Sequence, residues 1–343
     1  MENVINIIID SIDFRTLALL LALMLVVAGF RQSGVFERLV EMILGRLKSL
    51  RAIVGMLVML CFFTSMVVTN DVALITFVPF GIMVLNKVGR KDLLIPVLVF
   101  ETIAANLGSM ATPLGNPQNL YIYSISGMGF FELVIKMLPY VAASFVGVLI
   151  CLIFIPREKV DIEIGDKTKI DVLRSLAYLA AFAVCLLCVF HVIEYYSMLG
   201  AVLVVIAICD YKLLKKADYK LLLTFIVLFV LIGFLKNIDA VKNVLAGIIA
   251  GNEVLVGVAT SQVISNVPAA VLLSGFTSDY TSLLAGVNIG GLGTLIASMA
   301  SLITFRFYKK ENADGSSMKY VSYFTVANLI FMAALLILWV VIK

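Results

Sequence analysis

Charged residues are scarce in this chain: they make up 14% of its 343 residues, whereas hydrophobic residues make up 62% and the mean hydropathy is +1.10. A soluble domain of this size could not cover its surface with so few polar side chains. The apolar residues fall in long runs separated by short polar gaps, and a helix needs roughly 20 mainly apolar residues to cross a bilayer. The composition therefore predicts an all-α polytopic membrane protein surrounded by lipid.

Patterns typical of enzymes and metal sites are also lacking. The chain has a single His, His191, and no HExxH motif, GxSxG motif or catalytic Asp pair. Its five Cys all lie in apolar runs, and Cys185 and Cys188, although spaced like a redox pair, have no partner pair. We therefore expect no enzyme activity, no cofactor and no metal site other than one for Na⁺.

The few positive charges gather on one side of the predicted membrane. If residues 52–85 and 253–277 each enter and leave on one face as helical hairpins, all Lys and Arg except five share one side; the exceptions are Arg15, Lys136, Lys236, Lys242 and Lys343. Cytoplasmic loops carry such an excess. The sequence thus predicts a multi-pass protein of the inner (cytoplasmic) membrane with both termini outside, and the net charge of +4 needs no nucleic-acid partner.

Helix-breaking residues interrupt two of the apolar runs. The stretch ETIAANLGSMATPLGNPQNLYIY, residues 101–123, holds Asn, Gly and Pro where lipid is expected. Irregular backbone survives at that depth only where protein or a water-filled cavity satisfies its polar groups. We therefore predict broken helices at 93–126 and 281–305. The second break has Gly but no Pro and is expected to be gentler.

The two halves of the chain share landmarks in the same order. They are Asp13 and Asp218 at a helix start, Thr69–Asn70 and Ser265–Asn266 at a hairpin tip, and Asn106 and Asn288 at a break. Chance alignment of apolar helices would explain one such match more readily than three. Because the positive charges give the copies opposite orientations, we predict inverted-topology repeats at 1–172 and 173–343, with re-entrant hairpins at 52–85 and 253–277. This pattern is typical of secondary transporters with a midplane site.

Polar residues at the tips and breaks form the predicted binding site. The N-terminal ends of half-helices carry partial positive charge that attracts anions, and exposed carbonyls suit Na⁺. The same side chains could also simply cap helix ends. No Lys or Arg lies at the tips, so anion binding would rely on helix ends and amides. The predicted substrate-binding residues are Thr69, Asn70, Asn106, Thr112, Ser265, Asn266, Asn288 and Thr294.

Two carboxyl groups lie deep in the first half, Asp71 at the tip and Glu101 one turn before the break. A charge at the bilayer centre costs about 2.5–3.5 kcal/mol on insertion scales, so such groups are functional candidates. Their second-half counterparts are the apolar Val267 and Leu283. The alternative for Glu101 is a structural hydrogen bond. The predicted coupling-ion residues, for Na⁺ or H⁺, are Asp71, Glu101, Gly108 and Asn116.

Four segments resemble the ion transporter superfamily, which includes citrate transporter-like permeases, SLC13-type dicarboxylate carriers, ArsB-type arsenite permeases and NhaD-type antiporters. They are residues 69–71, 105–119, 261–268 and 287–291, and the likeness covers nearly the whole chain. The resemblance implies a homodimer that works as an elevator, with a scaffold and a moving transport domain. Substrate would lie between the two hairpin tips and the two broken helices.

The tips match the superfamily only in part. Thr69–Asn70 and Ser265–Asn266 match Ser-Asn-Thr tips that bind carboxylate and Na⁺ in dicarboxylate carriers, but Asp71 and Val267 replace the Thr. An Asp repels a dicarboxylate unless it is protonated or paired. An Asn-Asp tip is more similar to the arsenite and antiporter branches.

Together these observations predict an ion-coupled secondary active transporter of a small anion, either a citrate-like or dicarboxylate-like carboxylate or an oxyanion. The alternative is a Na⁺/H⁺ antiporter or an arsenite-type metalloid efflux permease, which the two deep carboxyl groups favour. A passive channel and a membrane-embedded enzyme fit the sequence less well.

Overall fold

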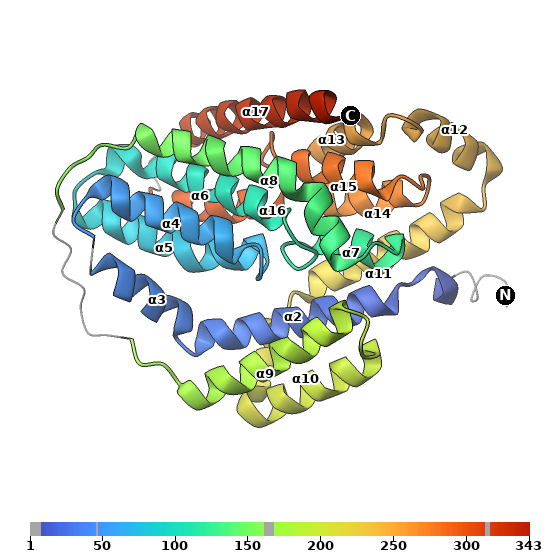
Figure 1. The fold of residues 1–343 in the computed structure, drawn as a ribbon, viewed down its shortest axis with the longest axis horizontal. Helices are drawn as coiled ribbons and strands as arrows, with labels where there is room; N and C mark the ends of the chain where they lie inside the picture. Colours follow the sequence, from blue (N-terminus) through green and yellow to red (C-terminus); the bar gives the residue numbers. More distant parts are fainter. Residues whose placement is uncertain (1–7, 46, 161–167, 313–315) are drawn as a thin grey trace.

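The computed structural model describes residues 8–45, 47–160, 168–312 and 316–343, which form helices and no β-strand (Figure 1). Seven of the helices in these ranges are long and apolar enough to cross a membrane, or up to eight if one bent pair is a single span. The prediction of an all-α polytopic membrane protein is confirmed.

The helices are of three kinds. The long continuous ones are α2 (Phe14–Gln32), α8 (Phe130–Ile153), α9 (Val172–Val189), α10 (Tyr195–Asp210), α11 (Tyr219–Lys236) and α17 (Ser317–Ile342). Those in the predicted hairpins and breaks are α4 (Leu50–Thr64), α5 (Asn70–Lys87), α6 (Leu94–Ser109), α7 (Pro117–Ser126), α13 (Glu253–Ile264), α14 (Asn266–Ser274), α15 (Tyr280–Ile289) and α16 (Met299–Glu311). Short connecting helices are α3 (Val35–Leu44), η1 (Lys91–Leu93), η2 (Tyr211–Lys216) and α12 (Asp239–Ile249).

Aspartate side chains begin four of the α-helices. Each accepts a hydrogen bond from a backbone N–H in the first turn, which satisfies one of the donors that a helix start leaves free. The four are Asp13 of α2, Asp171 of α9, Asp218 of α11 and Asp279 of α15. The matching starts at Asp13 and Asp218 are those that the sequence marked as a repeated landmark.

Each segment predicted to be a hairpin holds two helices joined by a turn. In the first, α4 ends at Thr64, α5 begins at Asn70, and the two helices pack against each other (Figure 1). In the second, α13 and α14 meet at Ser265, whose φ of 74° is unusual for a residue with a side chain. The second turn is therefore much tighter than the first.

Both predicted helix breaks are present. The first interruption covers residues 110–116, between α6 and α7, and the second covers residues 290–298, between α15 and α16. The second break, expected to be gentler because it lacks Pro, is the longer of the two. Glycine leaves the helical conformation at low cost, and Gly293 has a φ of 106°, so proline is not needed for this interruption.

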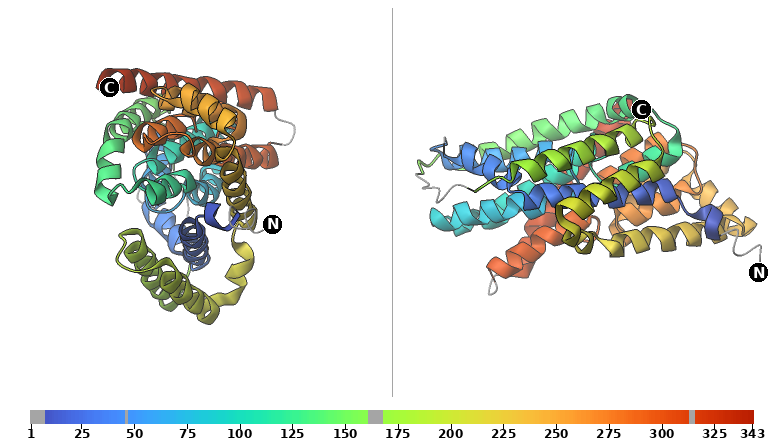
Figure 2. Two further views of the ribbon diagram at one scale, coloured as in Figure 1. Left: turned by 90° about the vertical axis from the view of Figure 1, so that its right-hand side faces the viewer. Right: turned by 90° about the horizontal axis from the view of Figure 1, so that it is seen from below.

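Helix α6 lies at the centre of the molecule. In the span Lys91–Ser109, 78% of residues are buried, against 17% in α11 and in α17. It packs against α4, α5, α8, α16 and α17. This mostly apolar helix is therefore surrounded by other helices of the protein. Helices α9 and α10 lie at one edge and α17 at the opposite edge (Figures 1 and 2), with large apolar side chains exposed as a lipid-facing surface requires.

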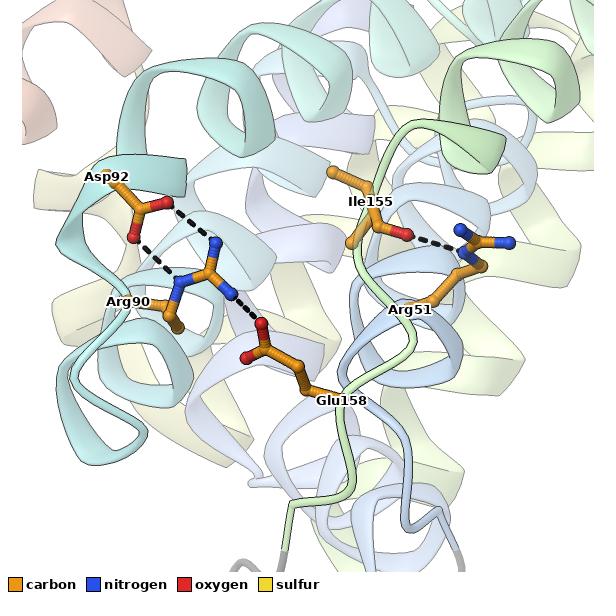
Figure 3. A network of polar contacts seen from close by, with 5 residues as sticks. All are labelled: Arg51, Arg90, Asp92, Ile155 and Glu158. Atoms are coloured by element: carbon orange, nitrogen blue, oxygen red, sulfur yellow. Dashed lines mark hydrogen bonds and ion pairs between the residues drawn. The ribbon is translucent and has the colours of Figure 1, made fainter.

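A polar network joins the chain after α8 to the ends of α4 and α5 (Figure 3). Arg90 pairs with Asp92 (2.7 Å) and with Glu158, and the guanidinium of Arg51 donates to the carbonyl of Ile155 (2.5 Å). The hydrogen bond from Arg90 holds the pKa of the Asp92 carboxyl below its usual range. This network lies at the end of the molecule that carries the basic loops, whereas the termini lie toward the other end (Figure 1).

Candidate functional site

The first hairpin tip is bonded to the first break. The backbone N–H of Asn70 donates to the carbonyl of Gly115 (3.0 Å), and its side-chain amide donates to Oδ1 of Asn106 (2.9 Å). The hydroxyl of Thr112 donates to the carbonyl of Met66, just before the tip. The structure therefore brings Asn70 into contact with Asn106, 36 residues further along the chain, and joins Thr112 to the residues just before the tip.

The second hairpin tip repeats this contact with the second break. The backbone N–H of Asn266 donates to the carbonyl of Ala297 (2.9 Å), as that of Asn70 does to Gly115. Gln262, one turn before the tip, donates to the carbonyl of Gly290 (2.8 Å) and accepts from the backbone N–H of Thr294 (3.0 Å). Sequence reasoning did not select Gln262, although a lone amide in the apolar α13 is the signal that could have found it.

Buried amides join the two breaks to each other. Asn116 donates to Oδ1 of Asn288 (3.1 Å), and Asn288 donates to Oδ1 of Asn119 (2.7 Å). Ser298 donates to Oδ1 of Asn106 (3.1 Å). All five side chains are buried. Because buried amides are costly unless bonded, this cluster fixes how the two broken helices meet; Asn119 and Ser298 were not among the predicted site residues.

A cavity of about 690 Å³ lies beside this cluster, among α2, α5, α7, α11 and α16. Three predicted site residues line it: Thr69, Asp71 and Asn116. Its other charged lining residues are Arg31, Glu37, Lys216, Asp218 and Arg306. Arg31, Lys216 and Arg306 were not among the predicted site residues because none lies at a tip. They lie on α2, η2 and α16, outside the two hairpins.

Other predicted residues lie behind the cavity instead of lining it. Asn106 and Asn288 are buried in the hydrogen-bonded cluster. Asn266 is also buried, and its backbone N–H donates to the carbonyl of Ala297 in the second break. The half-buried Ser265 donates to the carbonyl of Ala297 (3.3 Å). Of the eight predicted substrate-binding residues, Thr69 alone is in the lining of this cavity, and the other seven lie at the tips and breaks behind it.

Two predicted coupling-ion residues, Gly108 and Glu101, lie away from the cavity lining. A Cβ added at Gly108 would lie 2.7 Å from the hydroxyl of Ser65, so this glycine lets α6 pack closely on α4. The carboxyl of Glu101 is fully buried, and neither oxygen has a hydrogen-bond partner among the described residues. The structural hydrogen bond considered as an alternative is therefore not formed.

A second cavity of about 520 Å³ lies toward the other end, lined in part by Asp10, Asp13 and Lys236. Between the two cavities, α7 and α11 pack through aromatic rings. The ring of Tyr121 lies 6.1 Å from that of Phe225 and 5.3 Å from that of Phe229, centroid to centroid. We call these three residues the aromatic layer. Along α7, Leu120 lines the first cavity and Tyr121 the second, so the layer separates them.

The first cavity is within the roughly 300–1,000 Å³ range of small-molecule sites and is lined by both positive and negative groups. No cluster of three or more His, Cys, Asp or Glu residues suited to a metal ion occurs in the described ranges. Interrupted helices around a polar cavity, in a polytopic helical protein, are the architecture of membrane transport proteins.

Comparison with known sequences identifies the family. The sequence model of the family described as "Citrate transporter" matches residues 2–279, so the chain belongs to the citrate transporter family. It is a secondary transporter and not an enzyme, as its relatives' names also indicate.

Two of the three relatives described here match this chain over most of their own length. The chain is 38% identical to an uncharacterized transporter of Methanocaldococcus jannaschii, over 86% of this chain and 81% of the relative. It is 31% identical to inner membrane protein YbiR of Escherichia coli, over 86% and 80%. It is also 32% identical to a silicon efflux transporter of Oryza sativa, over 39% of this chain and 27% of the relative. The resemblance stated from the motifs is confirmed.

Proposed function

We propose that this protein moves a small anion, a carboxylate or an oxyanion, across the cytoplasmic membrane in a cycle coupled to H⁺ or Na⁺. The observation that carries the proposal is the position of three helix starts at the first cavity. Thr69 precedes α5, Asn116 precedes α7, and Met299 begins α16, and all three residues line the cavity. Helix N-termini carry partial positive charge, which favours an anion.

The charges of the lining support coupling to a cation. Arg31, Lys216 and Arg306 attract an anion to the cavity. Asp71 and Asp218 line the same space and would repel an anion in their ionised form. Binding a proton or Na⁺ at these carboxyls removes that repulsion, so anion binding and cation binding favour each other.

The order of elements supports the proposed inverted repeats. A long helix, a short helix, a hairpin, a broken helix and a long helix occur in α2 to α8 and again in α11 to α17. With the basic loops in the cytoplasm, both termini would lie outside. We propose that the hairpins re-enter the membrane and that the tips move with the broken helices relative to α2, α9, α10 and α11, as in an elevator.

Reconstitution tests the proposal. The protein in proteoliposomes should take up one of citrate, a dicarboxylate, sulfate or arsenite when an H⁺ or Na⁺ gradient is imposed, after a thermal-shift screen has ranked these solutes. Thr69→Val keeps the side-chain volume but removes the hydroxyl at the cavity, so the solute should bind about 10–100-fold more weakly, as for a lost bond to a charged group of about 1.5–3 kcal/mol.

Thr224→Val is the matched control, because the Thr224 hydroxyl donates to a carbonyl of its own helix on the exposed face of α11. Equal solute affinity in the two variants would remove Thr69 from the site. Absence of gradient-dependent flux for every solute tested would contradict the proposed function.

A metalloid efflux permease or cation/proton antiporter is the second candidate. The carboxyl groups Glu37, Asp71 and Asp218 in the cavity favour it, and a silicon efflux transporter is among the relatives. Under this function Asp71→Asn should abolish proton-coupled efflux of arsenite or silicate, or Na⁺/H⁺ exchange. Unchanged coupling in that variant would exclude Asp71 as the coupling group.

A further inference from the structure

Glu101 occupies a niche that the proposed transport cavity does not explain. It lies in the middle of α6, its side chain is 0% exposed, and both carboxyl oxygens lack a hydrogen-bond partner among the described residues. A Cβ placed at Gly81 of α5 would come within 2.9 Å of Oε1 and 3.3 Å of Oε2. The missing side chain of Gly81 therefore makes the room in which the carboxyl lies.

This niche is separate from the hairpin tip. Gly81 follows Asp71 by ten residues, which is about 15 Å along an α-helix. Asp71 lines the first cavity, and Glu101 does not. The sequence marked these two deep carboxyl groups together, but they lie at different heights along α5. Asp71 is at the start of α5, and Glu101 of α6 lies beside Gly81, further along α5.

The surroundings of Glu101 leave its charge without compensation. The titratable side chains that interact electrostatically with it are Cys61 on α4 and Tyr320 on α17, and both types are neutral at physiological pH. No ion pair involving Glu101 occurs among the described residues. An isolated buried carboxylate would cost so much that the group takes up a proton instead.

A purely structural acid would be expected to use its hydrogen-bonding groups, as Glu253 does. Glu253 is also buried, yet it accepts bonds from Gly251 N–H (3.3 Å) and the Thr277 hydroxyl (3.1 Å). Glu101 stabilises this conformation through no such bond. A carboxyl without such bonds suits a group that gains and loses a proton, and a different packing of α5 and α6 around Gly81 would let that proton leave.

We propose that Glu101 is a proton-binding site separate from the solute cavity, and that the transport cycle loads and unloads this proton. The inference rests on the proposed function and narrows its coupling ion to H⁺. A proton needs no further ligand, whereas hard metal cations bind several oxygen atoms at once. The space left by Gly81 holds the two carboxyl oxygens of Glu101.

Infrared spectroscopy of the purified protein tests the protonation directly. Wild-type protein at neutral pH should show the C=O stretch of a protonated carboxyl, and this band should be missing in Glu101→Gln. The control Glu253→Gln should keep it. Glu101→Asp should shift the band if the assignment is correct, which provides a second variant should Glu101→Gln fail to accumulate. A wild-type spectrum without the band, or a band unchanged in the Glu101 variants, overturns the proposal.

Flux measurements test whether the proton moves. Glu101→Gln should keep solute counterflow close to that of the wild type. The factor by which an inward proton gradient stimulates uptake should fall about tenfold, within the usual range of coupling factors. Glu253→Gln should keep both. Wild-type flux that depends on Na⁺ alone, or proton stimulation that persists in Glu101→Gln, refutes this inference and leaves the proposed function intact. A wild type without gradient-driven flux refutes the proposed function itself, while the infrared band still reports on Glu101.

Discussion

Replacing Asn288 by Ala tests whether the amide cluster holds the two broken helices together. Asn288 accepts a hydrogen bond from Asn116 (3.1 Å) and donates to Oδ1 of Asn119 (2.7 Å) and to the carbonyl of Leu284 (2.9 Å). Its side chain is buried. A buried polar group left without its partner costs about 1–3 kcal/mol. Because Asn116 keeps its bond to another residue and Asn119 loses the donor to its side-chain oxygen, we expect a loss of about 2–4 kcal/mol.

The assay is the midpoint of thermal unfolding in detergent, followed by the loss of the monodisperse peak in size-exclusion chromatography. Asn237→Ala is the matched control, because Asn237 donates to a carbonyl of its own helix (2.8 Å) but is exposed. Its removal should cost less than about 0.5 kcal/mol. The midpoint of Asn288→Ala should therefore fall clearly below that of the control.

A double-mutant cycle separates the bond from other effects of the substitution. Combining Asn288→Ala with Asn119→Ala should destabilise less than the sum of the single changes, with a coupling energy of about 0.5–3 kcal/mol. Equal midpoints for Asn288→Ala and Asn237→Ala would refute the reasoning, as would strict additivity in the cycle, because either result means that the amides do not bind the breaks together.

Three further predictions concern other contacts. The bond from Arg90 lowers the pKa of Asp92 in the folded protein, so it contributes stability at pH values above the pKa that Asp92 has in the unfolded chain. Arg90→Ala should therefore lower the unfolding midpoint at pH 7, and the difference from wild type should shrink below about pH 4, where Asp92 takes up a proton. A Cβ at Gly29 would lie 2.7 Å from the ring of Tyr178, so Gly29→Ala should cost about 1–3 kcal/mol through overpacking of α2 on α9, measured by the same assay. Tyr121→Phe keeps the ring but removes the hydroxyl bonded to α14 (2.8 Å), and should lower stability by about 1 kcal/mol.

The sequence was most informative where a residue type conflicts with its surroundings. Asn70, Asn106 and Asn288 are amides in apolar runs, so the sequence marked them, although as substrate-binding residues and not as members of a buried hydrogen-bonded cluster. The helix breaks at 110–116 and 290–298 could be predicted because clustered Gly, Pro and Asn disfavour a helix, and the freed backbone groups need protein or water at membrane depth.

The sequence was least informative where position depends on how helices rotate and pack. Arg31 and Arg306 read as ordinary basic residues at the ends of spans, and only the packing of α2 and α16 turns them toward the cavity. Gln262 was hidden for a different reason: its two carbonyl partners become free only because residues 290–298 leave the helix. The partners of a side chain in a broken region follow from tertiary structure and not from spacing.

Under the proposed function, the aromatic layer is the contact that transport has to change. Leu120 lines the first cavity, and Tyr121 and Phe229 line the second, so a solute that crosses between them has to pass the contact of Tyr121 with Phe225 and Phe229. Tyr121 is bonded to Ser274 of α14, whereas the two phenylalanines belong to α11. A movement that keeps the Tyr121–Ser274 bond must slide α7 and α14 together along α11. A movement that breaks it must separate α7 from the second hairpin, so the behaviour of Tyr121→Phe in flux assays distinguishes the two: unchanged flux favours opening by loss of this bond, and slowed flux favours joint sliding.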